Sequence, residues 1–244
     1  MSPSEKTKKV FICQSNYIPW KGYFDAINLA DEFIIYDDMQ FTKNDWRNRN
    51  QIKTSQGLQW LTIPVLISGK FGQKINETKI ADQSWQIKHW RAIQFNYAKA
   101  KYFSAYKDFF FELYDVVKSE YLSEVNYFFL SSLCKLLGIT TKIRRSSEFN
   151  LIEGRNERLL DLCIQTGTTD YYSGPAAKNY IDESLFLESG IKLHYIDYTN
   201  YPAYTQQWGD FVHAVSVIDL IMNEGENASN YMKSFSSVPM KKEI

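Results

Sequence analysis

A polar and aromatic segment, residues 14–20, follows the first apolar run of the sequence. Its amide side chains are Gln14 and Asn16, and its aromatic side chains are Tyr17 and Trp20. A segment with helical spacing comes next, so the first N–H groups of that helix can face an anion such as the phosphate of a nucleotide. We predict that the four side chains bind substrate; the alternative is an ordinary Pro-Trp turn that anchors the helix.

Two adjacent carboxylates, Asp37 and Asp38, follow the second apolar run, with Gln40 close behind them. Carboxylates just beyond a strand can bind Mg²⁺ or ribose hydroxyls, and such a group becomes a base when burial raises its pKa. We assign Asp38 to catalysis as a proton acceptor, and Asp37 and Gln40 to substrate binding. The alternative is a pair of solvated acids in a turn.

Residues 46–50 (WRNRN) interleave two arginines with two amides beside a tryptophan. A guanidinium group can donate two parallel hydrogen bonds to a phosphate or carboxylate, and the neighbouring indole can stack on a flat ring. We assign Asn48, Arg49 and Asn50 to substrate binding. The alternative is the solvated face of a hairpin, and two arginines do not indicate a nucleic-acid partner.

His89 shares one face of a predicted helix with apolar residues such as Trp85 and Tyr97. A titratable ring in that position can act as a general base near neutral pH, and we assign His89 to catalysis on this ground. The alternative is a core histidine whose hydrogen bonds are satisfied. His194 falls in an expected strand and His213 in the expected last helix, which makes both weaker candidates.

Two further loops, residues 170–175 and 201–206, are rich in polar and aromatic side chains. Loops of this composition often line sugar pockets. We assign Ser173, Tyr201 and Gln206 from them to substrate binding.

Cys13 ends the first apolar run, where a thiolate would be a nucleophile for acyl transfer. A buried cysteine that acts as a small hydrophobic residue is the favoured alternative. With Cys134 and Cys163, the cysteines are odd in number, widely spaced and without CxxC pairing. Neither a disulfide framework nor a metal site is therefore predicted.

The elements that position these residues begin with a βαβ unit. Residues 9–13 form a short apolar run typical of a buried strand, residues 22–30 have helical spacing, and residues 33–36 form a second β-rich run. A right-handed crossover makes the two strands parallel, so that both carboxyl ends open on the same edge of the sheet. Gln14 and Asp37 are therefore expected at the edge where open α/β sheets bind ligands.

The rest of the chain is expected to add a hairpin, a helical layer and further βα alternation. The expected elements are a hairpin within residues 48–67, helices within 85–138, strands at 140–145, 171–173 and 191–198, and helices at 156–166 and 211–223. The predicted fold is α/β, with a Rossmann-like, partly parallel sheet that starts with the βαβ unit and carries the hairpin and the helical layer as insertions. The expected limits are a flexible tail over residues 1–8, a single domain over 9–225 and a loosely held tail over 226–244.

Charge and hydropathy exclude some classes of partner. The chain has 28 basic and 28 acidic residues, so no overall field attracts nucleic acid or an anionic membrane. No apolar run reaches the roughly 18 residues of a membrane span, and the first residues are polar, so we expect a cytoplasmic protein. Aromatic residues make up 16% of the chain, which suits a sugar or nucleotide site, although an aromatic-rich core accounts for the same content.

The order of several short motifs resembles that of the WbqC-like family of bacterial proteins, from about residue 9 to residue 225. The motifs are Gln14-x-Asn16-Tyr17-x-Pro19-Trp20, Gly22-Tyr23-Phe24, Asp37-Asp38-x-Gln40, Asn48-Arg49-Asn50, Trp60-Leu61-Thr62-x-Pro64, Tyr172-Ser173-Gly174 and Ser216-x-x-Asp219-Leu220. The chain departs from the family at Ser15, where proline is usual, and at Cys13, where another small or polar residue is common.

The resemblance implies a place in the biosynthesis of bacterial O-antigen and related surface polysaccharides. We expect a transferase that moves an acyl or aminoacyl group to the amino group of a nucleotide-linked amino sugar. His89 or Asp38 would accept the proton, and Arg49 or the amides would hold the phosphates. The donor would be carrier-bound, which makes an acyl-carrier protein an expected partner, and no bound cofactor is identified.

Two alternatives remain open. The first is a glycosyltransferase or an ATP-dependent amide-forming enzyme on the same pathway, which would use Mg²⁺ held by Asp37 and Asp38. The second is a non-catalytic partner of a carrier protein or of an assembly.

Overall fold

Five short strands form the central sheet of the computed structural model, which describes residues 7–237, and the inner strands are the richest in β-branched and aromatic residues. The strands are β1 (Lys9–Cys13), β2 (Glu32–Ile35), β5 (Lys142–Arg145), β6 (Asp170–Ser173) and β7 (Lys192–Tyr195). They lie in the order β5-β2-β1-β6-β7, and each neighbouring pair is parallel. The predicted α/β class and the initial βαβ unit are confirmed.

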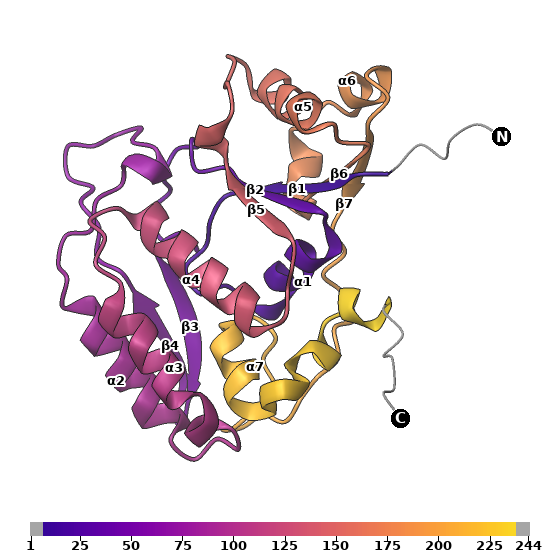
Figure 1. Cartoon of the computed structure of the whole chain (residues 1–244). Helices are drawn as coiled ribbons and strands as arrows, with labels where there is room; N and C mark the ends of the chain where they lie inside the picture. Colours follow the sequence, from indigo (N-terminus) through magenta and orange to yellow (C-terminus); the bar gives the residue numbers. More distant parts are fainter. Residues whose placement is uncertain (1–6, 238–244) are drawn as a thin grey trace.

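Alternate residues of the central strands pack on opposite faces of the sheet. Phe11 and Phe33 belong to the larger core, which on this face lies between the sheet and the helices α1 (Lys21–Leu29) and α7 (Val217–Glu224). Val10, Ile12 and Ile34 belong to the smaller core, which lies between the other face of the sheet and the helices α5 (Arg155–Thr166) and α6 (Glu183–Glu188). Figure 1 shows α5 and α6 above the sheet and α1 and α7 below it. Both faces are covered, as a parallel sheet requires.

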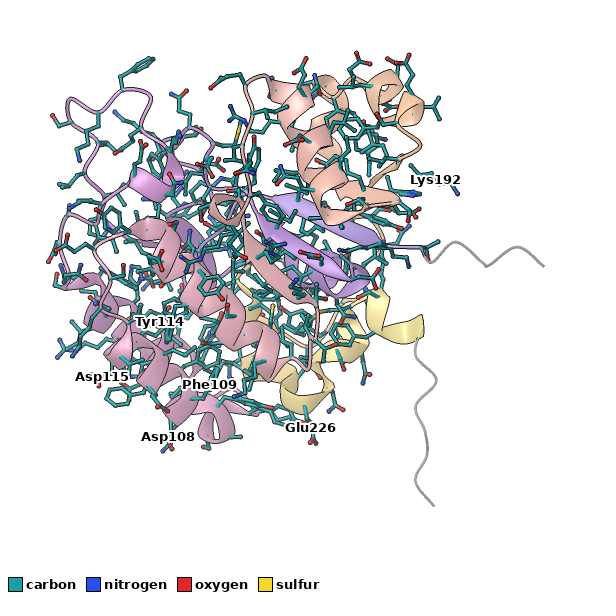
Figure 2. All side chains as sticks on the ribbon, turned by 45° about the horizontal axis from the view of Figure 1, so that its top comes forward. Asp108, Phe109, Tyr114, Asp115, Lys192 and Glu226 are labelled. Atoms are coloured by element: carbon teal, nitrogen blue, oxygen red, sulfur yellow. The ribbon has the colours of Figure 1, made fainter. Side chains whose placement is uncertain are left out.

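The segment between β2 and β5 forms the predicted hairpin and helical layer. The hairpin pairs β3 (Arg49–Thr54) with β4 (Gly57–Thr62), and the layer consists of α2 (Trp85–Tyr97), α3 (Phe103–Val116) and α4 (Leu122–Leu136). These elements lie on one side of the central sheet (Figure 1). In Figure 2, Asp108 and Asp115 of α3 extend from the surface, whereas the buried Tyr114 turns inward. The helix therefore contributes one apolar face to the larger core.

The strand order contains a switch point between β1 and β6. From β1 the chain continues to β2 and β5 on one side, and it returns to place β6 and β7 on the other side. Helices that leave the two adjoining strands run to opposite sides, which leaves a crevice beyond their carboxyl ends. In open α/β sheets this crevice is the usual place for a ligand.

The structure differs from the predicted elements near the C-terminus. The helix predicted over residues 211–223 begins only at Val217, because Ser216 has an extended ψ of 146° and its hydroxyl accepts a hydrogen bond from the N–H of Ile218. Residues 211–216 are a loop. Two 3₁₀ helices, Gly225–Tyr231 and Ser234–Ser237, occupy much of the tail predicted to be loosely held, and Ala228 and Met232 are buried in the larger core.

Both chain ends extend beyond the described residues. Residues 1–6 of the predicted N-terminal tail and residues 238–244 of the predicted C-terminal tail lie outside them. Lys8, which belongs to the predicted N-terminal tail, donates its backbone N–H to Thr169 Oγ1 at 2.8 Å. None of the helices in residues 7–237 combines the length and the apolar character that crossing a bilayer would need.

Candidate functional site

A cleft of about 690 Å³ opens at the switch point of the sheet. Ile12 and Cys13 at the end of β1 and Ser173 at the end of β6 form its floor. Residues from the loops around 14–20, 174–180, 198–201 and 213–214 form its walls. Its volume lies within the range of about 300–1,000 Å³ that is typical of small-molecule sites.

A strained turn in residues 14–20 shapes one wall of the cleft. Ile18 has a positive φ of 37°, which is rare for a β-branched residue and costs about 1–3 kcal/mol. The Asn50 side chain holds this turn, since its Nδ2 donates to the carbonyl oxygens of Tyr17 at 3.1 Å and of Ile18 at 3.0 Å. Tyr17 and Ile18 are fully buried and anchor the turn in the core, whereas Gln14 and Asn16 line the cleft.

The guanidinium group of Arg47 lies against this wall and lines the cleft. Its Nη2 donates to Gln14 Oε1 at 3.1 Å, its Nη1 donates to Asn16 Oδ1, and its Nε lies 3.6 Å from Asp45 Oδ2. The two amide oxygens orient the guanidinium without removing its charge. Asp45 balances part of that charge from the more exposed side.

A second guanidinium group, that of Arg155, lines the cleft at the first residue of α5. It stacks on the ring of Tyr180 at 3.8 Å from the centroid and forms no salt bridge with any residue in the range 7–237. The first turn of α5 already contains the carboxylate of Glu157, so the start of the helix has an acidic partner of its own. The guanidinium of Arg155, which has no such partner within residues 7–237, favours an anion at this end of the cleft.

Aromatic side chains form much of the remaining wall. The Trp20 ring contacts Tyr198 at 5.2 Å and Tyr201 at 5.4 Å between centroids, both nearly edge to face. Tyr201 also donates its hydroxyl to Asp25 Oδ2, which fixes the ring. Gly22 is required beside Trp20, because a Cβ at that position would collide with the indole. The rings are thus held in place before any ligand arrives.

The structure brings together only some of the predicted substrate-binding residues. Those that line the cleft are Gln14, Asn16, Trp20, Asn50, Ser173 and Tyr201. Other lining residues were not assigned from the sequence: Tyr36, Arg47, Arg155, Tyr180, Tyr198 and His213. Arg47 belongs to the segment 46–50, from which only the three residues after it were assigned to binding. His213 was a weaker catalytic candidate because it was expected in a helix, and nothing near Arg155 in the sequence indicates a site.

His89 and Tyr17 lie in the core and not at the cleft. His89 is 6% exposed; its Nδ1 lies 2.9 Å from the Tyr17 hydroxyl and its Nε2 lies 3.2 Å from the carbonyl oxygen of Thr62. The Tyr17 hydroxyl also bonds that of Tyr114 at 2.8 Å. Burial lowers the pKa of His89 to about 4. This is the satisfied core histidine of the alternative interpretation, and we do not carry its catalytic role forward.

Asp37 and Asp38 point away from the cleft and are engaged in other contacts. Buried Asp37 accepts hydrogen bonds from the N–H and the hydroxyl of Ser15 at 2.8 and 2.7 Å, and burial raises its pKa although these bonds oppose the shift. Asp38 accepts from Ser146 Oγ at 2.6 Å and from Asn76 Nδ2 at 3.2 Å. In residues 7–237 no cluster of three or more histidine, cysteine or acidic side chains is placed to hold a metal ion.

The other predicted binding residues also lie away from the cleft. Asn48 donates to the carbonyl of Ile63 at 2.8 Å and closes the end of the hairpin. Arg49 stacks on Trp60 at 4.1 Å from the ring centroid. Gln40 is exposed, and Gln206 closes its own loop through hydrogen bonds of 2.9 Å to both backbone groups of Val212. Asn48 and Gln206 thus have structural contacts that account for them.

We predict that the thiol of Cys13 reacts slowly. Burial raises the pKa of Cys13 above its ordinary value of 9, although the nearby Arg47 opposes the shift. At pH 7 the thiolate fraction is therefore smaller than that of a free cysteine with a pKa of about 8.5. Iodoacetamide should modify Cys13 more slowly than free cysteine, and peptide mapping by mass spectrometry would measure the rate separately for each cysteine. Rapid labelling of Cys13 at pH 7 would contradict this expectation.

Comparison with known proteins covers almost the whole chain. The model of the WbqC-like protein family matches residues 14–231. The uncharacterized protein Rv1507c of Mycobacterium tuberculosis is 50% identical over 226 residues, which are 93% of this chain and 98% of the relative. No solved structure shows a significant match. The matched range includes every residue that lines the cleft except Ile12 and Cys13.

Proposed function

The chain belongs to the WbqC-like protein family, and from this premise we propose that it is a transferase of surface-polysaccharide biosynthesis. The proposed reaction moves an acyl or aminoacyl group to the amino group of a nucleotide-linked amino sugar. One observation carries the proposal: two separate guanidinium groups stand in an aromatic cleft at the switch point of a parallel sheet.

In this proposal the diphosphate of the nucleotide binds the two guanidinium groups. Arg47 presents N–H groups from one wall, and Arg155 presents an unpaired charge beside the N-terminus of α5. None of the residues that line the cleft is an aspartate, a glutamate or a lysine. The lining therefore carries a net positive charge, which favours an anionic ligand.

In this proposal the aromatic side chains of the cleft bind the nucleobase and the sugar. Tyrosine and tryptophan present flat apolar faces to a nucleobase or to the C–H groups of a pyranose, and their polar atoms bond hydroxyl groups. Trp20, Tyr198 and Tyr201 form one such wall, and the amides of Gln14 and Asn16 lie between it and Arg47. A nucleotide-linked sugar combines the groups that these walls are suited to bind.

The transfer requires an activated donor, which we propose to be a carrier-bound acyl or aminoacyl group. The amine nitrogen attacks the acyl carbon, a C–N bond forms, and the bond to the carrier breaks with its electron pair on the leaving group. Binding both reactants in one cleft supplies the orientation that such a reaction needs. An acyl-carrier protein is the proposed macromolecular partner.

The positions of Asp37 and Asp38 do not favour the metal-dependent alternatives. A glycosyltransferase or an ATP-dependent enzyme would use Asp37 and Asp38 as ligands for Mg²⁺, yet neither side chain lines the cleft. Asp37 is bonded to Ser15, and Asp38 to Asn76 and Ser146. We therefore favour transfer to the amine over these reactions.

Product formation tests the proposal directly. Purified protein would be incubated with a panel of dTDP- and UDP-linked amino sugars and with acyl or aminoacyl donors, free and carrier-bound. We expect one amino sugar to gain the mass of the acyl group, and we expect the corresponding N-acetylated sugar to gain none. If the sugars bind but no donor yields a mass gain, the protein is a binding partner and not a transferase.

A further inference from the structure

We propose that His213 is the general base of the cleft, the group that takes the proton from the attacking amine. This inference rests on the proposed function, and it assigns to His213 the role that the sequence indicated for His89 or Asp38. The catalytic group then comes from the loop between β7 and α7, far along the chain from the loop at residues 14–20.

His213 is exposed and lines the cleft, unlike the other histidines of the chain. His89 is buried with both ring nitrogens engaged. His194 bonds Asp170 at 2.8 Å and stacks on Tyr172 at 4.7 Å between centroids. The ring nitrogens of His213 have no hydrogen-bond partner among residues 7–237, so they are available to a ligand.

The other titratable groups of the cleft are unsuited to accept a proton near neutral pH. The thiol of Cys13 has a raised pKa because it is buried, and the guanidinium groups of Arg47 and Arg155 stay protonated. Burial raises the pKa of the tyrosine hydroxyls on the walls, which are those of Tyr23, Tyr36, Tyr171, Tyr180, Tyr198 and Tyr201. Imidazole is the remaining base.

The fold holds His213 in place from both sides. Before it, the backbone N–H and carbonyl of Val212 bond the side chain of Gln206. After it, Ser216 N–H donates to the carbonyl of Gln51 at 2.8 Å, and Val217 N–H donates to the carbonyl of Pro19 at 2.9 Å. Because Pro19 also lines the cleft, this bond attaches the loop that carries His213 to the loop at residues 14–20.

The surroundings of His213 keep its ring neutral. Although the ring is exposed, its partial desolvation lowers the pKa of His213 from the ordinary value of 6.5, and the positive charge of Lys21 on α1 acts in the same direction. The charged groups that line the same cleft are Arg47 and Arg155, which are also positive. The imidazole packs against the ring of Phe211 in a T-shaped arrangement at 4.5 Å between centroids. A neutral ring is the form that can accept a proton.

The proposed step is balanced without any further reactant beyond the carrier-bound donor. As the amine nitrogen bonds the acyl carbon, one N–H proton passes to a ring nitrogen of His213. Collapse of the tetrahedral intermediate breaks the bond to the carrier, and the leaving group takes the electron pair. The imidazolium then returns its proton to the leaving group.

The test compares His213→Gln with the wild-type protein and with His194→Gln as a matched control. We expect His213→Gln to lower kcat by roughly 100-fold or more, which is the usual contribution of a general base. Its Kd for the nucleotide-linked amino sugar should change less than about threefold. Added imidazole should restore part of the rate, and His194→Gln should react at the wild-type rate.

The pH profile adds a readout that a structural role would not change. The wild-type rate should fall as the pH drops below the pKa of His213, and this limb should be absent in His213→Gln. Any limb set by the substrate amine should remain in both proteins. If His213→Gln fails to fold, His213→Asn serves the same comparison.

Three outcomes would separate the two proposals. A rate and a pH profile of His213→Gln equal to those of the wild type would overturn the role of His213 and leave the transferase proposal standing. A wild-type protein that binds the amino sugar but yields no product would overturn both. Loss of rate together with loss of nucleotide affinity, without rescue by imidazole, would overturn catalysis by His213.

Discussion

Between pH 6.5 and pH 4 the protein should lose about 3 kcal/mol of its free energy of unfolding because His89 is buried in its neutral form. The ring has a pKa of about 4 in the folded protein and about 6.5 in the unfolded chain. In this window the unfolded chain binds a proton that the folded protein excludes, so the stability falls as the pH falls. Each pKa unit corresponds to about 1.4 kcal/mol, which sets the size of the loss.

The hydrogen bonds of His89 explain why the neutral form is required. Nε2–H donates to the carbonyl of Thr62, and Nδ1 accepts from the hydroxyl of Tyr17. Protonation of Nδ1 would replace this acceptor with a donor in a site that Trp85 and Tyr114 enclose. Burial is the main cause of the lowered pKa of His89, the charge of Lys88 acts in the same direction, and the hydrogen bond to Thr62 opposes the shift.

Urea denaturation of the wild type and of His89→Ala at several pH values would measure the effect. The variant should be less stable by about 3 kcal/mol at pH 7, since it leaves a cavity and removes the ring that bonds Tyr17. Its stability should depend less on pH between 6.5 and 4. Nucleotide affinity should be nearly unchanged. A variant of wild-type stability that had lost turnover would instead restore the catalytic role.

The first strands of the sheet could be predicted because each is marked in the sequence by a short apolar run. The runs Lys9–Cys13 and Glu32–Ile35 are apolar, short and bounded by polar residues, and both are strands at nearly the expected limits. Gly167 ends α5 with a left-handed φ of 65°, as its position after a helical pattern indicates. The late start of α7 had a signal too, because Ser216 and Asp219 have the spacing of a helix N-terminus.

The site was predictable only where a residue directly follows a strand of the sheet. Gln14 follows β1 and Ser173 ends β6, and both reach the cleft. Asp37 follows β2 equally closely, but its carboxylate turns to the N–H of Ser15. Proline, which is usual in the family at position 15, has no N–H to donate, so this contact depends on the serine.

The order of the strands in the sheet cannot be predicted from short sequence patterns, because it depends on contacts between distant parts of the chain. Arg155 reaches the cleft because β6 lies beside β1 and so brings the start of α5 to the switch point. His213 does so because the loop before α7 is bonded to Gln51 and Pro19. The pairing of β1 with β6 and the two hydrogen bonds of the loop before α7 all join residues more than a hundred positions apart in the sequence. Periodicity, which reports on near neighbours, cannot reveal them.

Replacement of Arg47 with alanine should weaken the binding of a nucleoside diphosphate by about 10- to 100-fold. A hydrogen bond to a charged group contributes about 1.5–3 kcal/mol, and each 1.4 kcal/mol is a factor of ten in Kd. The guanidinium also positions Gln14 and Asn16 through its own hydrogen bonds. Arg47→Lys should recover only part of the affinity, because an ammonium group cannot reproduce the planar set of donors.

Arg49→Ala is the matched control for this change. Arg49 lies only two positions further along the chain and carries the same charge, but it stacks on Trp60 and bonds Asn44 outside the cleft. Calorimetric titration with UDP at low and at moderate salt should show a large loss for Arg47→Ala and a change of less than about twofold for Arg49→Ala. Added salt should weaken binding more in the wild type than in Arg47→Ala, since the variant lacks one of the charges that salt screens. Equal losses in the two variants would mean that overall charge, and not the guanidinium in the cleft, attracts the nucleotide.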